Sequence, residues 1–338
     1  MARLKTLRPW VTSACFALCA LALGACSSSD DQSSGSGGAA GTAASGGTSN
    51  AGSAGQASGG SAGSSGGGGG SAGAPDTSPM GGDRPVTPFI PESYNAANAT
   101  PLVVMLHGFG ASGGVQETII FQLKALAEEK TFIYIYPDGT VGADGRRFWN
   151  ATDWCCDLNN TGVDDVAYLS GLIAEAKQRY NIDDKRVYMM GHSNGGFMSH
   201  RFACDHPELL AGIASLAGAG DANQANCTPS VPVNVLQMHG TDDQTVSYTD
   251  KPGLPGAEQT VANWAKLNGC TSQLTPLGTP ADYVSGDDGA ETDKLNYSGC
   301  AAGGAVELWR MNGAGHIPGL TDAYRRDLVE WLLAHPKP

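Results

Sequence analysis

Apolar and polar positions follow two recurring patterns along most of the chain. Short apolar runs rich in β-branched and aromatic residues are typical of buried strands, and stretches with apolar residues every three or four positions are typical of covering helices. The predicted strands cover residues 132–136, 186–190, 210–216, 232–238, 306–311 and the first part of 100–110; the predicted helices cover residues 115–129, 163–180, 194–204, 257–267 and 322–333. This alternation predicts an α/β fold with a doubly wound, mostly parallel sheet and helices on both faces.

Two of the predicted helices carry more specific expectations. Ile119, Leu123 and Leu126 form the apolar stripe of the helix at 115–129. Asp164 and Asp165 fall in the first turn of the helix at 163–180, where carboxylates favour the free N–H groups and the helix dipole. The segment between these helices, residues 146–161, is polar and aromatic and predicts a long loop.

The pattern is absent before residue 83. Residues 27–82 are mostly Gly, Ser and Ala, which cannot bury enough apolar surface to offset the entropy of ordering, and we expect a disordered tether before a single domain at 83–338. Residues 1–26 combine three basic residues with an apolar run at 11–23 that is too short to span a membrane, as in a signal peptide.

The signal ends in the sequence Leu-Gly-Ala-Cys at Cys26, which resembles the bacterial lipoprotein signal. That resemblance implies lipidation of Cys26 and an extracytoplasmic location, anchored at the cell surface or outer membrane. An ordinary cleaved signal, which would release a secreted protein, is the alternative. The lipid anchor is the only membrane contact that we expect.

Charge and cysteine content narrow the function further. The formal net charge is −13, which repels nucleic-acid phosphates, and no basic patch or base-stacking motif occurs, so nucleic-acid binding is not predicted. Six cysteines remain after the signal, and an even number in an exported domain predicts three disulfides. No cysteine or histidine spacing typical of zinc is present, so we predict no metal. The six cysteines that follow the signal are Cys155, Cys156, Cys204, Cys227, Cys270 and Cys300.

The motif G-x-S-x-G at Gly191–Gly195 lies between a predicted strand and a predicted helix. With 48 glycines in 338 residues, matches also occur at 59–63, 63–67 and 69–73, but only Ser193 follows a predicted strand and precedes a predicted helix. A sharp turn at that place lifts the serine hydroxyl out of the sheet. We therefore predict Ser193 as a nucleophile.

A serine nucleophile needs a base and a group that orients the base. His316 follows the last predicted strand in a glycine-containing loop, and we predict it as the base. Asp243, which follows the strand at 232–238, is the preferred orienting acid over its neighbour Asp242. The backbone N–H groups of Phe109 and Asn194 are the predicted oxyanion donors, a role that constrains their side chains only weakly.

Eight segments together resemble the secreted esterases that group polyhydroxybutyrate depolymerases with feruloyl and acetylxylan esterases, carbohydrate esterase family one. The resemblance runs from about residue 101 to the C-terminus, and it implies an α/β-hydrolase fold and a cofactor-free carboxylic ester hydrolase with Ser193, Asp243 and His316 as its triad. The segments are Leu106-His-Gly, Trp149-Asn-Ala, Cys155-Cys, Gly162-Val-Asp-Asp, Gly191-His-Ser-Asn-Gly-Gly, Ala203-Cys, His239-Gly-Thr-x-Asp and Gly313-x-Gly-His.

The same resemblance implies the disulfide pairing. Cys270 is expected to pair with Cys300. Cys155 and Cys156 are expected to bond to Cys204 and Cys227, in an order that the sequence leaves open.

The substrate is less well defined than the chemistry. The family often has a tryptophan and a proline after the histidine, whereas here His316 is followed by Ile317 and Pro318, which changes the expected pocket. Trp149, Trp154 and Ile317 are candidates for its lining. We expect a monomer that hydrolyses polymeric or small esters, with feruloyl or acetyl esters of polysaccharides first. Poly(3-hydroxybutyrate) is the alternative substrate, and a non-catalytic glycan-binding lipoprotein is the alternative of another class.

Overall fold

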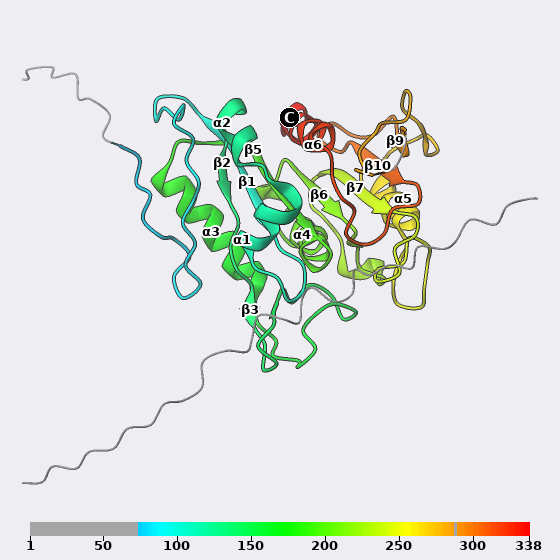
Figure 1. The fold of residues 1–338 in the computed structure, drawn as a ribbon, viewed down its shortest axis with the longest axis horizontal. Helices are drawn as coiled ribbons and strands as arrows, with labels where there is room; N and C mark the ends of the chain where they lie inside the picture. Colours follow the sequence, from blue (N-terminus) through cyan, green and yellow to red (C-terminus); the bar gives the residue numbers. More distant parts are fainter. Residues whose placement is uncertain (1–73, 287–288) are drawn as a thin grey trace, which may run out of the picture. The chain divides into compact units, whose positions relative to one another are not determined.

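The structure is a computed structural model that describes residues 74–286 and 289–338 (Figure 1). The predicted signal peptide, Cys26 and the predicted tether up to residue 73 lie outside the described residues. Among the described residues, none of the helices has the length and apolar character needed to cross a membrane.

A sheet of eight strands forms the centre of the domain, in the order β2-β1-β5-β6-β7-β10-β9-β8 (Figure 1). Neighbours from β2 to β10 pair in parallel, as predicted, whereas β9 and β8 add an antiparallel edge that the sequence did not predict. The strands are β1 (Thr100–Leu106), β2 (Ile133–Ile135), β5 (Ile182–His192), β6 (Gly212–Leu216), β7 (Asn234–Gly240), β8 (Thr275–Pro276), β9 (Thr292–Tyr297) and β10 (Val306–Met311); a separate hairpin joins β3 (Thr140–Val141) and β4 (Arg147–Phe148).

Helices cover both faces of this sheet, because alternate strand residues point to opposite sides. Along β1, Leu102 and Val104 enter the core under α3, α4 and α5, and Val103 and Met105 enter the core under η1, α2 and α6. The helices are α1 (Gly113–Gln116), the π-helical η1 (Glu117–Phe121), α2 (Lys124–Lys130), α3 (Asp165–Arg179), α4 (Asn194–Asp205), α5 (Ala257–Leu267) and α6 (Asp322–Ala334), with short 3₁₀ turns η2 (Pro207–Leu209) and η3 (Gln224–Asn226).

The helix predicted at 115–129 is broken into three pieces. Gln122 ends η1 with a φ of 53°, and the buried carboxylate of Glu117 accepts the N–H groups of Leu123 and Lys124 that open the next segment. Leu123 is buried as expected, but the break turns Ile119 outward, where it is 62% exposed. The predicted apolar stripe is therefore wrong at Ile119.

The packed region begins before residue 83, the predicted end of the tether. Met80 is buried and forms a backbone bridge with Val86, and Gly81 N–H donates to Glu175 of α3. Arg179, at the end of the same helix, donates to the carbonyl of Ser78. The boundary predicted at residue 82 is therefore wrong by several residues, because α3 captures the chain before it.

One of the two implied disulfide arrangements is wrong. Cys270 bonds to Cys300 as expected. Cys204 at the end of α4 bonds to Cys227 rather than to Cys155 or Cys156, since their Cα atoms lie only 4.8 Å apart, within the range that a disulfide spans. Cys155 and Cys156 bond to each other.

Candidate active site

Ser193 lies in the tight turn between β5 and α4, and its backbone shows why glycines flank it. Its φ is 54°, a left-handed value unusual for a residue with a side chain, and its N–H donates to Leu216 O at 2.8 Å. A Cβ on Gly191 would lie 2.4 Å from Gly195 C, and one on Gly195 would lie 2.2 Å from Leu106 O. The turn can therefore close only with glycine at both positions.

Three loops at the carboxyl edge of the sheet bring the predicted triad residues together. Ser193 follows β5, Asp243 follows β7 and His316 follows β10. His316 Nε2 lies 3.0 Å from Ser193 Oγ, and His316 Nδ1 lies 2.7 Å from Asp243 Oδ2. Both distances are those of hydrogen bonds, so the hydroxyl, the imidazole and the carboxylate form one continuous series.

The carboxylate of Asp243 is buried and accepts several hydrogen bonds. Its Oδ1 accepts the N–H groups of Thr245 and Val246 at 2.8 and 2.9 Å. Burial by itself would raise the pKa of Asp243, but hydrogen bonds from His239 and His316 hold that pKa well below its usual range. An ionised Asp243 keeps the proton of His316 on Nδ1, which leaves Nε2 free to accept from Ser193. Asp242 is exposed in the adjacent turn.

The loop after β1 runs directly behind Ser193. A Cβ on Gly108 would lie 3.4 Å from the Ser193 Cβ, and the N–H of Gly108 donates to the buried Gln116 side chain at 3.1 Å. In the described part of the chain, the next N–H, that of Phe109, has no hydrogen-bond acceptor. The N–H of Asn194 is the first of α4 and has no acceptor within its own helix. Both predicted oxyanion donors thus lie on segments that adjoin Ser193.

The side chain of Asn194 is strongly constrained, contrary to expectation. It is fully buried; its Oδ1 accepts from Trp149 N–H at 2.7 Å and its Nδ2 donates to Trp149 O at 2.8 Å. The same Nδ2 lies 3.5 Å from Cys155 Sγ. This pair of bonds fixes the first turn of α4 against the loop at Trp149. One indication of this role is present in the sequence, an amide side chain directly after Ser193.

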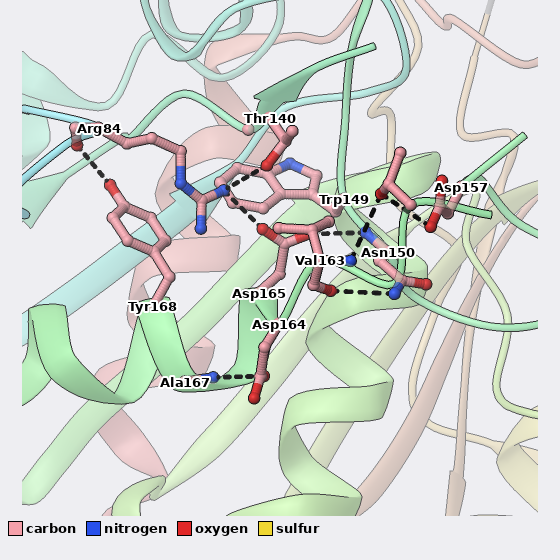
Figure 2. A network of polar contacts seen from close by, with 12 residues as sticks. Arg84, Thr140, Trp149, Asn150, Asp157, Val163, Asp164, Asp165, Ala167 and Tyr168 are labelled. Carbon is pink, nitrogen blue, oxygen red and sulfur yellow. Dashed lines mark hydrogen bonds and ion pairs between the residues drawn. The ribbon is translucent and has the colours of Figure 1, made fainter. Parts of the chain in front are cut away.

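A charged network contacts that loop at Asn150, next to Trp149 (Figure 2). Asp165 Oδ2 accepts from Asn150 N–H at 2.7 Å, and Asp165 Oδ1 pairs with Arg84 at 2.5 Å. The Arg84 guanidinium lies 3.6 Å from the ring centre of Tyr168, whose hydroxyl donates to Arg84 O (Figure 2). Asp164 caps α3 by accepting from Ala167 N–H, and Asp165 lies in the first turn, both as expected. Asp165 is in addition the buried ion-pair partner of Arg84.

The three residues predicted to line a pocket have different environments. Trp149 is fully buried and its indole donates to His107 O, so its prediction as a lining residue is wrong. Trp154 is 43% exposed and stacks on Phe197 of α4 with ring centres 5.4 Å apart. Ile317 is 65% exposed beside His316. Of the three, Trp154 and Ile317 expose apolar surface to solvent.

His192, next to Ser193, contacts the backbone of His316. Its Nε2 lies 2.9 Å from His316 O, and since a carbonyl can only accept, His192 is the donor. Burial, reinforced by the nearby His316, lowers the pKa of His192 to about 4, so it stays neutral at neutral pH. The sequence did not distinguish this role. Over residues 74–286 and 289–338, no three His, Cys, Asp or Glu side chains gather as metal ligands would.

Known proteins show the same fold and similar sequences. Residues 92–252 match the family described as phospholipase/carboxylesterase. Feruloyl esterase B from Piromyces equi is 29% identical over 241 residues, 68% of this chain and 42% of its own length. Poly(3-hydroxyalkanoate) depolymerase C from Paucimonas lemoignei is 32% identical over 172 residues, 51% of this chain and 36% of its own length. This chain therefore spans less than half of either relative.

Among solved structures, the acetyl xylan esterase from Aspergillus awamori superposes with a TM-score of 0.53 at 16% identity, covering 77% of this chain and 97% of that chain. At that identity the match concerns the fold alone. The described domain has the α/β-hydrolase fold, and its residues 92–252 match the phospholipase/carboxylesterase family.

Proposed function

We propose that this protein is a serine carboxylic-ester hydrolase that acts on polysaccharide-linked feruloyl or acetyl esters. The observation that carries the proposal is the hydrogen-bonded series of Ser193, His316 and Asp243. A serine hydroxyl is a weak nucleophile unless a base accepts its proton, and these distances permit that transfer. The similarity to a feruloyl esterase supports the choice of ester.

In this mechanism Ser193 Oγ attacks the ester carbonyl carbon while His316 Nε2 takes its proton. Asp243 stabilises the imidazolium, and the N–H groups of Asn194 and Phe109 hold the oxyanion. The tetrahedral intermediate collapses to an acyl-enzyme, and His316 passes the proton to the departing alcohol. Water then attacks the acyl carbon and gives a proton to His316, which returns it to Ser193 as the acid leaves. No cofactor takes part in these steps.

Poly(3-hydroxybutyrate) is a second candidate substrate, favoured by the similarity to the poly(3-hydroxyalkanoate) depolymerase. The exposed Ile317 and Trp154 would present apolar surface to either an aromatic acyl group or a polyester. Release of ferulate from arabinoxylan and clearing of polyester granules separate the two. If the protein binds glycan but hydrolyses neither ester, a non-catalytic glycan-binding function replaces both candidate activities.

The proposal is tested by comparing wild-type protein with Ser193→Ala on p-nitrophenyl acetate and methyl ferulate. Loss of the triad serine typically lowers kcat by a factor of about 10⁶. We expect turnover of both esters by the wild type and none above background by the variant. Equal turnover by Ser193→Ala would refute the assignment of the nucleophile, and no turnover by folded wild type would refute an esterase.

Export and anchoring are a separate part of the proposal, supported by the signal-like segment that ends at Cys26. In a bacterial host, the wild type should fractionate with membranes and Cys26→Ser should not. The same distribution for both proteins would contradict a lipid anchor.

A further inference from the structure

A chain of four buried polar side chains leads from α5 to the carboxylate of Asp243. Trp264 Nε1 lies 2.9 Å from His200 Nδ1, and His200 Nε2 lies 2.9 Å from Gln237 Oε1. Gln237 Nε2 lies 3.2 Å from His239 Nδ1, and His239 Nε2 lies 3.3 Å from Asp243 Oδ2. All four side chains belong to residues that are at least 98% buried.

The direction of the first two bonds follows from the indole. An indole nitrogen can only donate, so His200 Nδ1 must accept and carry no proton. Burial lowers the pKa of His200 to about 4, and the neutral ring therefore carries its proton on Nε2. His200 must then donate to Gln237, which places the amide oxygen of Gln237 on that side.

The remaining bonds are fixed by two backbone carbonyls. With its oxygen facing His200, Gln237 directs both amide hydrogens the other way, one to Gly218 O at 2.8 Å and the other to His239 Nδ1. His239 Nδ1 accepts, so its proton is on Nε2, which also faces Val246 O at 2.9 Å. Because Gly218 O and Val246 O can only accept, they require the same assignment independently of Trp264.

We propose that Trp264, His200 and Gln237, together with the carbonyls of Gly218 and Val246, hold His239 in place as its Nε2–H tautomer, and that His239 acts as a positioning residue for Asp243. The opposite tautomer would place a nitrogen lone pair against both the carboxylate of Asp243 and the carbonyl of Val246. The chain and the Val246 carbonyl thus agree on the His239 ring nitrogen that presents its N–H to the carboxylate. Asp243 Oδ2 then lies between two donors, His239 Nε2 at 3.3 Å and His316 Nδ1 at 2.7 Å.

The proposal rests on the proposed esterase function only for its effect on turnover. The carboxylate of Asp243 orients His316, so a shift of Asp243 moves the His316 imidazole away from Ser193. The contacts that bind the substrate stay the same. Disturbing the chain is therefore expected to lower kcat and to leave KM nearly unchanged. A displacement of about 1 Å at a reacting group can cost up to about a hundredfold in rate, and we expect a loss of roughly tenfold from a partly relaxed chain.

The test compares Trp264→Phe with Trp331→Phe in the full-length protein labelled with 15N-histidine. Both replace a buried helical tryptophan, but Trp331 lies in α6 beside His335 and takes no part in the chain. Nitrogen-15 spectra distinguish protonated from bare ring nitrogens and report each tautomer directly. In the wild type and in Trp331→Phe we expect His200 and His239 as single Nε2–H tautomers. In Trp264→Phe we expect a mixture of tautomers at His200, because His200 Nδ1 loses its donor, and a roughly tenfold lower kcat, while Val246 O keeps His239 as the Nε2–H tautomer.

A second pair of variants tests His239 itself. Glutamine at this position can return an N–H to Asp243, whereas leucine cannot, so His239→Gln should retain several times the kcat of His239→Leu at similar KM. Equal kcat for the two variants would overturn the positioning role. A wild-type His239 protonated on Nδ1, or a Trp264→Phe protein with the spectrum and kcat of Trp331→Phe, would overturn the chain. Wild-type protein without ester turnover would refute the proposed function, while the spectra would still decide the tautomer.

Discussion

The exchange Asn194→Asp tests how the first turn of α4 is held. Aspartate has nearly the shape of asparagine, and its first oxygen can still accept from Trp149 N–H. Its second oxygen replaces the Nδ2 that donates to Trp149 O at 2.8 Å. When the aspartate is ionised, two oxygens face each other in a fully buried position with no proton between them.

The cost of that contact follows from its parts. The lost hydrogen bond costs about 1 kcal/mol. An unpaired buried charge costs about 3 kcal/mol or more, which gives a total of about 4 kcal/mol. A protonated carboxyl avoids this cost, because its O–H can donate to Trp149 O. The native pKa of the new aspartate should therefore rise by about three units, from about 4 to about 7.

The raised pKa gives the effect a definite pH dependence. Between about pH 4 and pH 7 the native state binds more protons than the unfolded state, so the free energy of unfolding falls as pH rises. The loss is near zero below pH 4, about 1.4 kcal/mol at pH 5 and about 4 kcal/mol above pH 7. For a domain of this size, about 4 kcal/mol lowers Tm by about 8–16 °C.

Thermal unfolding of wild type and Asn194→Asp at pH 5 and pH 8 measures this difference, together with kcat for p-nitrophenyl acetate at both values. Asn98→Asp, an exposed site before β1, is the matched control and should change stability by less than about 0.5 kcal/mol. A Tm difference that is the same at pH 5 and pH 8, or no difference at pH 8, would refute the paired hydrogen bonds to Trp149.

Two further exchanges test the turn at Ser193 and the charged network around Arg84 and Asp165. Gly195→Ala should abolish folding or ester turnover, because the added Cβ has no space. The control Gly171→Ala lies in α3, where a Cβ meets nothing within 4 Å, and should raise the free energy of unfolding by roughly 0.5–1 kcal/mol. Comparable losses of stability in both variants would contradict the steric argument. Arg84→Ala should lower the free energy of unfolding by about 3–5 kcal/mol, because it leaves Asp165 buried without its partner. The control Arg326→Ala breaks an exposed ion pair and should lower it by less than about 1 kcal/mol. Urea unfolding measures both, and equal midpoints for the two variants would count against a supporting role for the buried pair.

Much of the fold follows from relations between neighbouring residues. The alternation of apolar runs and amphipathic stretches predicted the parallel centre of the sheet, and α5 and β10 begin and end where predicted. The flanking glycines predicted the turn at Ser193, because a strand-to-helix turn this tight excludes a Cβ. The chain order of Ser193, Asp243 and His316 predicted which residues meet at the edge of the sheet. Their catalytic roles remain proposals.

What only the tertiary structure decided depends on residues that are far apart in the sequence. The spacing of the cysteines along the chain could not show that Cys204 bonds to Cys227, because it favours no one partner among the cysteines. The pairing follows only from the folded structure, in which the end of α4 lies against the loop after β6. Periodicity predicted one long helix, but it could not show that the carboxylate of Glu117 would take the N–H groups that continue it.

The buried polar contacts around the site belong to the same class. Nothing local indicates that Asn194 pairs with Trp149, or that a tryptophan in α5 leads through His200 and Gln237 to Asp243. From the sequence alone, a polar residue is predicted to lie in a turn or at the surface. Its structural role is known only when folding buries it beside one specific partner. Local patterns therefore determined where the reactive groups lie, and long-range burial determined what holds them in place.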